Sequence, residues 1–277
     1  MKFYKIISIT IILILSAMLS ACSATEKTNA QSDNKKIKIG ATAGPYGDQL
    51  NEGIKPYLEK KGYEVEVVEF NDYIQPNVAL NEGDIDANVF QNFNYLKNFA
   101  EERDMDMIEL IKVPTAPIGI YSKKHKSIDD VEDGHTVATS NDPVNQARAL
   151  IMLEQIGWVK LKEGIEPTKA SEKDIAEYIK KIVIEPLDPA QTPRALESVD
   201  YAFVNGNFAI SSGLKLSEAV ELEKTPPSYM IGVTLRGEDE DSQLGKDLIE
   251  AYQSEEFKKL NEENEKYQGY VWPDWMK

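Results

Sequence analysis

The sequence is poor in the residues that many enzymes use for catalysis: of 277 residues, one is cysteine and two are histidine. Cys22 has no partner for a disulfide within the chain, so stability must come from a hydrophobic core. The motifs Gly-x-Ser-x-Gly and His-Glu-x-x-His and glycine-rich phosphate loops are absent from the sequence. His125 and His135 have charged or polar neighbours and lack the sequence spacing of zinc ligands. We therefore expect both histidines to be solvated, and we expect no catalytic residue, no metal and no cofactor.

Basic residues are also few compared with acidic ones. The chain has 31 Lys and Arg against 47 Asp and Glu, and its formal net charge is -16. A surface of this sign repels nucleic acid and anionic lipid headgroups. Nucleic acid is therefore not an expected partner, and a body that lies flat on a membrane is disfavoured.

The only long apolar run, Ile6 to Leu19, is too short to span a membrane comfortably. It has 14 residues, whereas a membrane-spanning helix needs about 20. Two lysines precede the run and small residues follow it, which is typical of a secretory signal. The tetrapeptide Leu19-Ser20-Ala21-Cys22 resembles the lipobox of bacterial lipoproteins. An ordinary signal peptide with a chance cysteine, or an uncleaved anchor, is the alternative.

The lipobox resemblance implies a signal peptide over residues 1–21 and a diacylglycerol on the sulfur of Cys22. Residues 23–36 contain no large apolar side chain, and composition of this kind predicts a flexible tether over 22–36. We expect a protein held at the cell membrane by its lipid anchor and facing the exterior.

From Ile37 onward the hydrophobic pattern alternates between strands and helices, which predicts an α/β fold with mostly parallel sheets. The expected strands cover residues 37–42, 65–70, 87–91, 107–112, 118–122, 135–139, 182–185, 201–204 and 229–235. The expected helices cover residues 46–61, 73–81, 142–157, 190–197 and, as an acidic tail, 242–267. Gly62 is the expected stop of the first helix.

Two local similarities indicate two related lobes with a ligand cleft between them. The segments Ala41-Thr42-Ala43-Gly44-Pro45 and Ala138-Thr139-Ser140-Asn141-Asp142-Pro143 each read as a strand, a polar turn and a proline that opens a helix. A helix end, an acidic turn and a strand also recur in both halves. We therefore predict residues 37–120 as the first part of lobe 1, 121–228 as lobe 2, and 229–277 as the return to lobe 1.

Ligands of open α/β sheets bind beyond the carboxyl ends of strands, which directs attention to the helix that opens at Asn141. The N-terminus of a helix suits a carboxylate, and Asn145 and Arg148 share one face of this helix. A guanidinium can grip a carboxylate with two hydrogen bonds. The structural alternative is an N-cap at Asn141 or Asp142 and a solvated Arg148.

Other candidates lie at the ends of neighbouring strands. Asn205 follows the predicted strand 201–204, and its amide can both donate to and accept from an amino-acid backbone. A simple turn residue is the alternative. Four aromatic residues lie near the cleft side of the first lobe, and each is expected either to line the cleft or to pack in the hydrophobic core; they are Tyr73, Phe90, Phe93 and Tyr95.

At these residues the chain resembles the methionine-binding lipoproteins of bacterial ABC importers. The matching segments are Phe70-Asn71-Asp72-Tyr73, Pro76-Asn77, Gly83-Asp84-Ile85-Asp86-Ala87-Asn88, Phe90-Gln91, Tyr121-Ser122-Lys123-Lys124, Asn141-Asp142-Pro143, Asn145, Arg148-Ala149-Leu150, Pro193-Arg194-Ala195-Leu196 and Val204-Asn205. The resemblance covers nearly all of the chain after residue 21. It implies a two-lobed periplasmic-binding-protein fold that closes on methionine or a small methionine peptide and presents it to a membrane permease.

The resemblance also assigns roles to individual residues. It implies that Tyr73, Phe90 and Tyr95 surround the thioether, that Arg148 binds the ligand carboxylate, and that Asn145 and Asn205 hold the polar backbone groups. The family commonly has histidine after Phe-Gln, where this chain has Asn92, so the pocket is expected to lack that charge. The alternatives are an exported enzyme, a zinc-binding importer lipoprotein and a binding protein for a different small ligand.

Overall fold

The structure is a computed structural model that describes residues 35–277. The predicted signal peptide, Cys22 and nearly all of the predicted tether lie outside the described residues. Lys35 and Lys36, which we expected in the tether, instead begin strand β1 (Lys35–Thr42). Their backbone pairs with Tyr63 and Glu64, and this pairing leaves both lysine side chains exposed.

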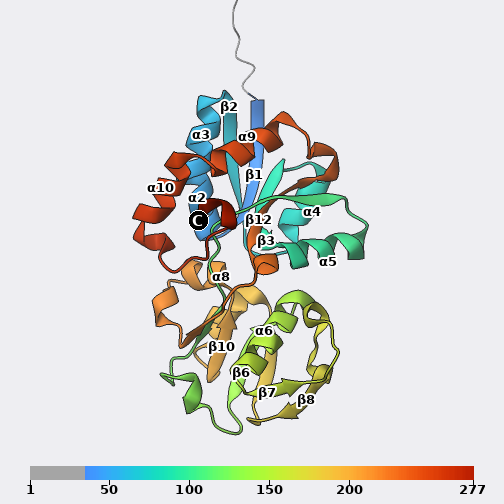
Figure 1. Cartoon of the computed structure of the whole chain (residues 1–277), viewed down its shortest axis with the longest axis vertical. Helices are drawn as coiled ribbons and strands as arrows, with labels where there is room; N and C mark the ends of the chain where they lie inside the picture. Colours follow the sequence, from blue (N-terminus) through green and yellow to red (C-terminus); the bar gives the residue numbers. More distant parts are fainter. Residues whose placement is uncertain (1–34) are drawn as a thin grey trace, which may run out of the picture. The chain divides into compact units, whose positions relative to one another are not determined.

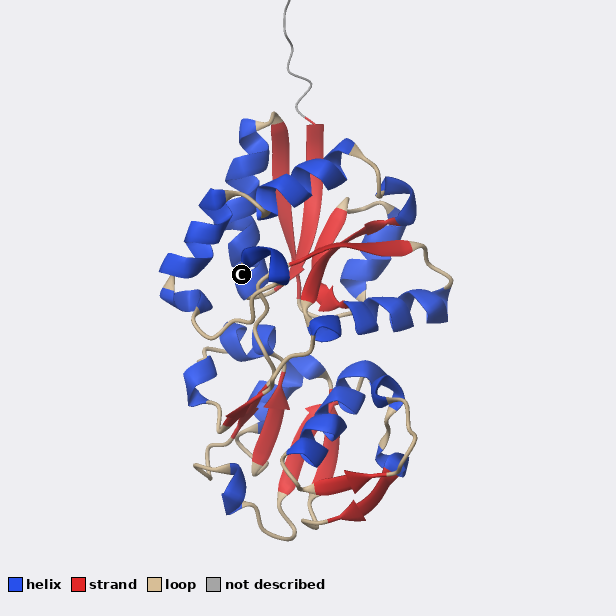
Figure 2. Cartoon of the chain, in the orientation of Figure 1, coloured by secondary structure: helices blue, strands red, loops and turns tan. Residues whose placement is uncertain are grey.

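Two five-stranded sheets form the centres of two lobes (Figures 1 and 2). The first sheet contains, in spatial order, β2 (Tyr63–Phe70), β1, β3 (Ala87–Asn92), β12 (Ile231–Arg236) and β4 (Met107–Lys112). The second contains β11 (Glu221–Leu222), β5 (Gly119–Tyr121), β10 (Tyr201–Val204), β6 (Thr136–Ser140) and β9 (Val183–Leu187). These lobes confirm the predicted α/β, two-lobed fold.

Each sheet is mixed, because in each lobe the strand that follows a crossing starts at the cleft. Strands β1, β2 and β3 are parallel, whereas β12 is antiparallel to its two neighbours. In the second sheet β5 is antiparallel to both of its neighbours, β11 and β10, whereas β10, β6 and β9 are parallel to one another. Both β5 and β12 directly follow a crossing between the sheets, so they run against the strands that end at the cleft.

Helices cover both sheets. Around the first sheet lie α2 (Pro45–Gln49), a π-helical segment (Leu50–Ile54), α3 (Lys55–Lys60), α4 (Gln75–Glu82), α5 (Phe93–Arg103), α9 (Gln243–Tyr252) and α10 (Glu255–Glu263). The second lobe contains α6 (Pro143–Gln155), α7 (Thr192–Ala195), α8 (Gly206–Ser211) and the hairpin β7 (Val159–Leu161) and β8 (Ile175–Tyr178). Single 3-10 turns cover Ile128–Asp130, Pro167–Lys169, Glu172–Asp174, Pro189–Gln191, Leu216–Glu218, Pro227–Tyr229, Gly237–Asp239, Glu265–Tyr267 and Asp274–Met276.

Local sequence explains most of these bounds. The predicted helix over 46–61 is α2, the π-helical segment and α3 in succession, and Gly62 follows it with a φ of 89°. That left-handed conformation suits glycine, as expected of a helix stop. The predicted acidic tail is interrupted at Ser254, whose hydroxyl accepts a hydrogen bond from Phe257 N and so starts α10.

The chain crosses between the sheets twice, between β4 and β5 and between β11 and β12. Strand β5 belongs to the second sheet from Gly119 onward, slightly before the expected start of lobe 2 at residue 121. One buried core lies in each lobe, around Ile39 and Leu50 in the first and around Trp158 in the second. A third apolar cluster contains residues of both lobes, including Tyr73 and Phe208, and it lies at the cleft.

Candidate functional site

A small cavity lies where elements of the two lobes meet. Its volume is about 20 Å³, which is space for about one water molecule. The crossing segment between β4 and β5 contributes Thr115, Ala116 and Ile118 to its lining. Seven of the eight predicted ligand-binding residues also line it, namely Tyr73, Phe90, Asn92, Tyr95, Asn145, Arg148 and Asn205.

The eighth residue, Asn141, does not reach this cavity. Its side chain is exposed and borders a wider outer cavity of about 300 Å³. The N-cap of α6 is Asp142, whose carboxylate accepts from Asn145 N at 2.9 Å, so Asn141 precedes the cap. Phe93 is likewise 44% exposed in the first turn of α5 and does not line the inner cavity.

Aromatic rings form the wall on the side of the first lobe. The Tyr73 ring lies 5.8 Å from Phe90 and 5.8 Å from Tyr95, the latter in an edge-to-face arrangement. Phe208 of the second lobe packs behind this wall at 5.0 Å from Tyr73 and lines the outer cavity. The edge of an aromatic ring favours contact with sulfur, so this wall suits a thioether as well as an aliphatic side chain.

Asn92 has a structural role that the sequence reading missed. Its Oδ1 accepts a hydrogen bond from Tyr95 N at 3.0 Å and caps helix α5, an element absent from the predicted set. The signal was available, because an N-cap asparagine precedes Tyr95, Leu96 and Phe99, the buried positions of this helix. The cap fixes Asn92 at the cavity, where its amide carries no charge.

Buried amides hold the end of β3 in place. Asn77 and Gln91 exchange two hydrogen bonds of 2.7 and 2.6 Å, and Gln91 also donates to Asn88 and Thr234. All four side chains are at most 3% exposed. A buried polar network whose hydrogen bonds are all satisfied makes the surrounding core rigid. The end of β3 therefore holds Phe90 and Asn92 at the cavity in a fixed orientation.

Arg148 is buried and ion-paired, which excludes the alternative of a solvated side chain. Its Nε donates to Glu223 at 2.6 Å and its Nη2 donates to the other oxygen of the same carboxylate. Both side chains are at most 5% exposed. The ring of Tyr229 lies 4.7 Å from the guanidinium carbon, so the cation is held on one edge and one face.

The pair leaves part of the guanidinium free for a ligand. Of its five N–H donors, Glu223 occupies two, and those on Nη1 have no partner within the described residues. Burial works against both charges, but their attraction keeps the pKa of Glu223 below, and that of Arg148 above, the ordinary value. Arg148 therefore stays charged and oriented. Sequence reasoning missed Glu223, which lies 75 positions from Arg148 and carries no local signal.

A chain of amides connects the strand ends of the second lobe. Ser140 Oγ donates to Asn205 at 3.0 Å, Asn205 donates to Asn145 at 3.1 Å, and Asn145 donates to Asp142 at 3.1 Å. These bonds use only part of each amide's capacity for hydrogen bonding. Asn145 and Asn205 are thus pre-oriented side by side and retain polar atoms for the backbone of a ligand.

Asn207 of α8, which the sequence reading did not single out, joins the lobes across the cavity. It accepts from the Tyr73 hydroxyl at 2.7 Å and donates to Thr42 Oγ1 at 3.2 Å. Both partners belong to the first lobe, and all three residues are buried. The two bonds exist only while the lobes are together.

Asn207→Ala is expected to weaken ligand binding by about 1–3 kcal/mol, because it leaves the buried Tyr73 hydroxyl unpaired in the closed form. The corresponding increase in Kd is about 5- to 150-fold. Calorimetric titration of the variant measures it. Asn51→Ala is the control, since Asn51 is exposed and its amide bonds within its own helix. Equal losses in the two variants would contradict a closing role for Asn207.

The two histidines lie outside the cavity and are less solvated than we expected. Both are partly buried, and their ring centroids are 4.6 Å apart. With Asp200 they form the single group of potential metal ligands among residues 35–277. The fold brings together residues that are far apart in the sequence, and spacing alone could not reveal this.

The two sheets, the double crossing and the buried cavity define a two-lobed binding protein for a small ligand. A model of the NlpA lipoprotein family matches residues 37–275, and the chain belongs to that family. Among residues 35–277 no helix has the length and apolar character needed to cross a membrane.

Several known proteins are similar over most of their length. The D-methionine-binding lipoprotein MetQ of Salmonella typhi is 36% identical over 247 residues, which are 88% of this chain and 89% of the relative. Outer membrane lipoprotein 3 of Mannheimia haemolytica is 35% identical over a region that covers 95% of this chain and 96% of the relative. A nutrient binding protein from Burkholderia cenocepacia, solved bound to methionine, is 40% identical with a TM-score of 0.80 and covers 85% of this chain and 99% of its own.

Proposed function

We propose that this chain is the lipid-anchored, substrate-binding subunit of an importer and that it binds methionine or a small methionine peptide. The observation that carries the proposal is the pairing of an aromatic wall from one lobe with a buried, pre-oriented arginine from the other. The names of the similar lipoproteins and the methionine in the Burkholderia cenocepacia structure support the same ligand class. The protein itself catalyses no reaction.

In the proposed mode of binding, the ligand carboxylate meets the free edge of Arg148. Asn145 and Asn205 hold the polar backbone groups, and the side chain lies against Tyr73, Phe90 and Tyr95. Asn92 lines the same cavity without a titrating imidazole, so no histidine-type pH response of binding is expected there.

Closure of the lobes delivers the ligand. The inner cavity, at about 20 Å³, is too small to hold an amino acid, so the ligand enters when the lobes separate about the two crossing segments. Binding then favours the closed form, which Asn207 and Tyr73 stabilise. The closed surface of both lobes is the surface that a membrane permease of the ABC type recognises.

The choice of ligand is tested by a panel screened for the rise in melting temperature. Methionine, or a small methionine peptide, is expected to raise it more than norleucine, leucine or glutamine. Contact of sulfur with ring edges favours the thioether over an aliphatic chain by about 0.3–1.5 kcal/mol. Glutamine should be rejected more strongly, because its amide needs buried partners. A rise with a metal ion or sugar and none with any methionine compound would contradict the proposal.

Membrane attachment is proposed to depend on Cys22. Cys22→Ser should abolish labelling by a radioactive fatty acid and release the protein from the membrane fraction, because stable anchoring requires two acyl chains. Lipid attachment of an exported protein places the binding lobes outside the cell. Equal label in the wild type and the variant would show that Cys22 is not the anchor.

A further inference from the structure

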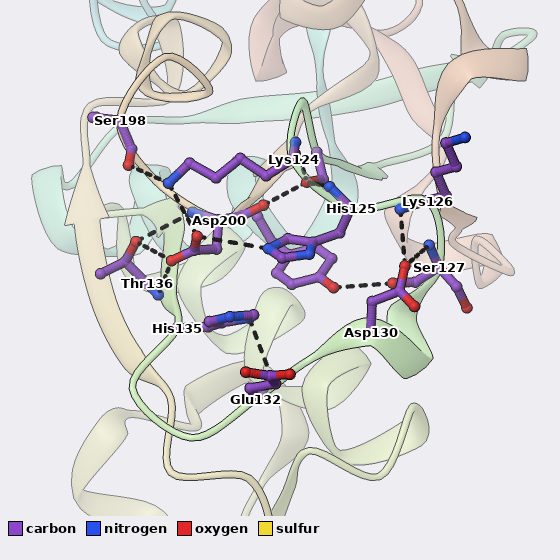
Figure 3. Close-up of polar contacts among 12 residues, drawn as sticks. Lys124, His125, Lys126, Ser127, Asp130, Glu132, His135, Thr136, Ser198 and Asp200 are labelled. Atoms are coloured by element: carbon purple, nitrogen blue, oxygen red, sulfur yellow. Dashed lines mark hydrogen bonds and ion pairs between the residues drawn. The ribbon is translucent and has the colours of Figure 1, made fainter.

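The two histidines of the chain meet on the second lobe, away from the cleft. His125 follows β5, His135 precedes β6, and Asp200 precedes β10 (Figure 3). The three side chains converge because β10 lies between β5 and β6 in the sheet. None of them lines the ligand cavity, so a role for this cluster is independent of the proposed function.

One ring nitrogen of His125 makes no hydrogen bond within the described part of the chain. Its ring stacks on Tyr201 with a centroid distance of 5.0 Å, and its side chain is 20% exposed. The Nε2 atom is buried and has no hydrogen-bond partner among residues 35–277, although it lies 3.6 Å from Asp200 Oδ1. A buried polar atom of this kind calls for a partner.

The other two side chains offer the complementary atoms. His135 Nδ1 accepts from Glu132 N at 3.2 Å, an exposed and rather long bond (Figure 3). Asp200 Oδ2 accepts from the backbone and the hydroxyl of Thr136 at 2.8 and 3.0 Å, and Lys124 Nζ donates to Oδ1 at 3.0 Å. Burial opposes the charge of Asp200, but these hydrogen bonds outweigh it and hold its pKa below the ordinary value. Asp200 is therefore a carboxylate at neutral pH.

We propose that His125, His135 and Asp200 bind a zinc-type divalent cation. One potential ligand atom from each residue lies within 4.8 Å of the others. Two ligand atoms of a tetrahedral zinc ion are about 3.4 Å apart. Side-chain rotations that move the ligand atoms by about 1 Å therefore suffice to reach this spacing. Imidazole and carboxylate donors suit zinc, and the fourth position is left for water.

Lys124 is the competitor for this site. Its ammonium contacts Asp200 Oδ1 and also donates to Ser198 O at 2.8 Å. The lysine side chain is 43% exposed, so it can turn into solvent when a cation of higher charge takes its place. Metal binding therefore exchanges one positive charge for another beside Asp200.

The test uses the full chain, purified in detergent with a tag that contains no histidine. Because the sequence has only two histidines, proton NMR of their rings reports on this site alone. Titration with zinc chloride is expected to shift both ring signals together and to saturate at one equivalent. His125→Gln and His135→Gln should each weaken binding at least about tenfold, since even the loss of an outer partner of a metal ligand costs that much.

Lys124→Gln distinguishes a metal site from a merely structural cluster, because it should tighten zinc binding. Lys126→Gln is its control, since Lys126 is exposed and only its backbone contacts Asp130; this variant should bind zinc like the wild type. Melting in the presence of a chelator verifies that each variant folds. The proposal is overturned if zinc leaves both ring signals unchanged, or if the double variant His125→Gln/His135→Gln binds zinc as tightly as the wild type.

Discussion

Arg148→Ala is expected to weaken methionine binding by about 2–5 kcal/mol, the range for removing one partner of a buried charged pair. This corresponds to an increase in Kd of roughly 30- to several-thousand-fold. The same substitution should also lower the free energy of unfolding by about 3–5 kcal/mol, because it leaves the Glu223 carboxylate buried without its partner. This loss of stability follows from the Arg148–Glu223 pair, whose partners are 75 positions apart in the sequence.

The double variant Arg148→Ala/Glu223→Gln separates the two effects. It removes the lone buried charge, so thermal unfolding should recover much of the lost stability, while calorimetric titration should still show the weakened binding. If binding recovered together with stability, Arg148 would support the fold and would not contact the ligand.

Gly206→Ala is expected to give the second large effect. A Cβ at this position would lie 2.5 Å from the Ala116 Cβ and 2.6 Å from the carbonyl oxygens of Ala116 and Pro117. These are mostly backbone atoms of a crossing segment, so the segment itself has to move away from α8. Overpacking of this kind costs about 1–3 kcal/mol, occasionally more, and here it also widens the ligand cavity. We therefore expect a lower melting temperature and weaker methionine binding.

Gly47→Ala is the matched control, because the nearest atom to its added Cβ, Thr42 O, is 3.9 Å away. Gly47 lies in α2, where alanine is favoured over glycine by about 0.5–1 kcal/mol. Thermal unfolding of both variants decides the matter. A Gly206→Ala protein that melted and bound methionine like the wild type would show that the crossing segment is not packed tightly on α8.

Strands and long helices were predictable from the sequence because their hydrophobic periods are local. The helix ending at Gly62 and the α6 helix opened by Asp142 and Pro143 are examples. Helix α5 was missed although its N-cap Asn92 was visible in the sequence, because its first turn contains Phe93 and Asn94, which are weak helix formers. The β7–β8 hairpin was missed because its strands are short and half exposed.

The candidate site was predictable where a residue lies near the end of a strand, as for Phe90 and Asn92 in β3 and for Asn205 directly after β10. It was not predictable where a contact links distant segments. The pair of Arg148 with Glu223 and the bonds of Asn207 to Tyr73 and Thr42 depend on how the lobes come together. The histidines gave the same lesson, because their own neighbours in sequence are polar while their neighbours in space are Tyr201 and each other.

Identification of the ligand that the protein selects tests the central claim most directly. The full chain is unfolded, freed of small molecules and refolded, then dialysed against an equimolar mixture of the twenty amino acids and short methionine peptides. After rapid gel filtration and denaturation, mass spectrometry identifies what was retained. We expect one equivalent of methionine or of a methionine peptide. A stoichiometric amount of any other amino acid, or no retained ligand from a correctly refolded protein, would contradict the account.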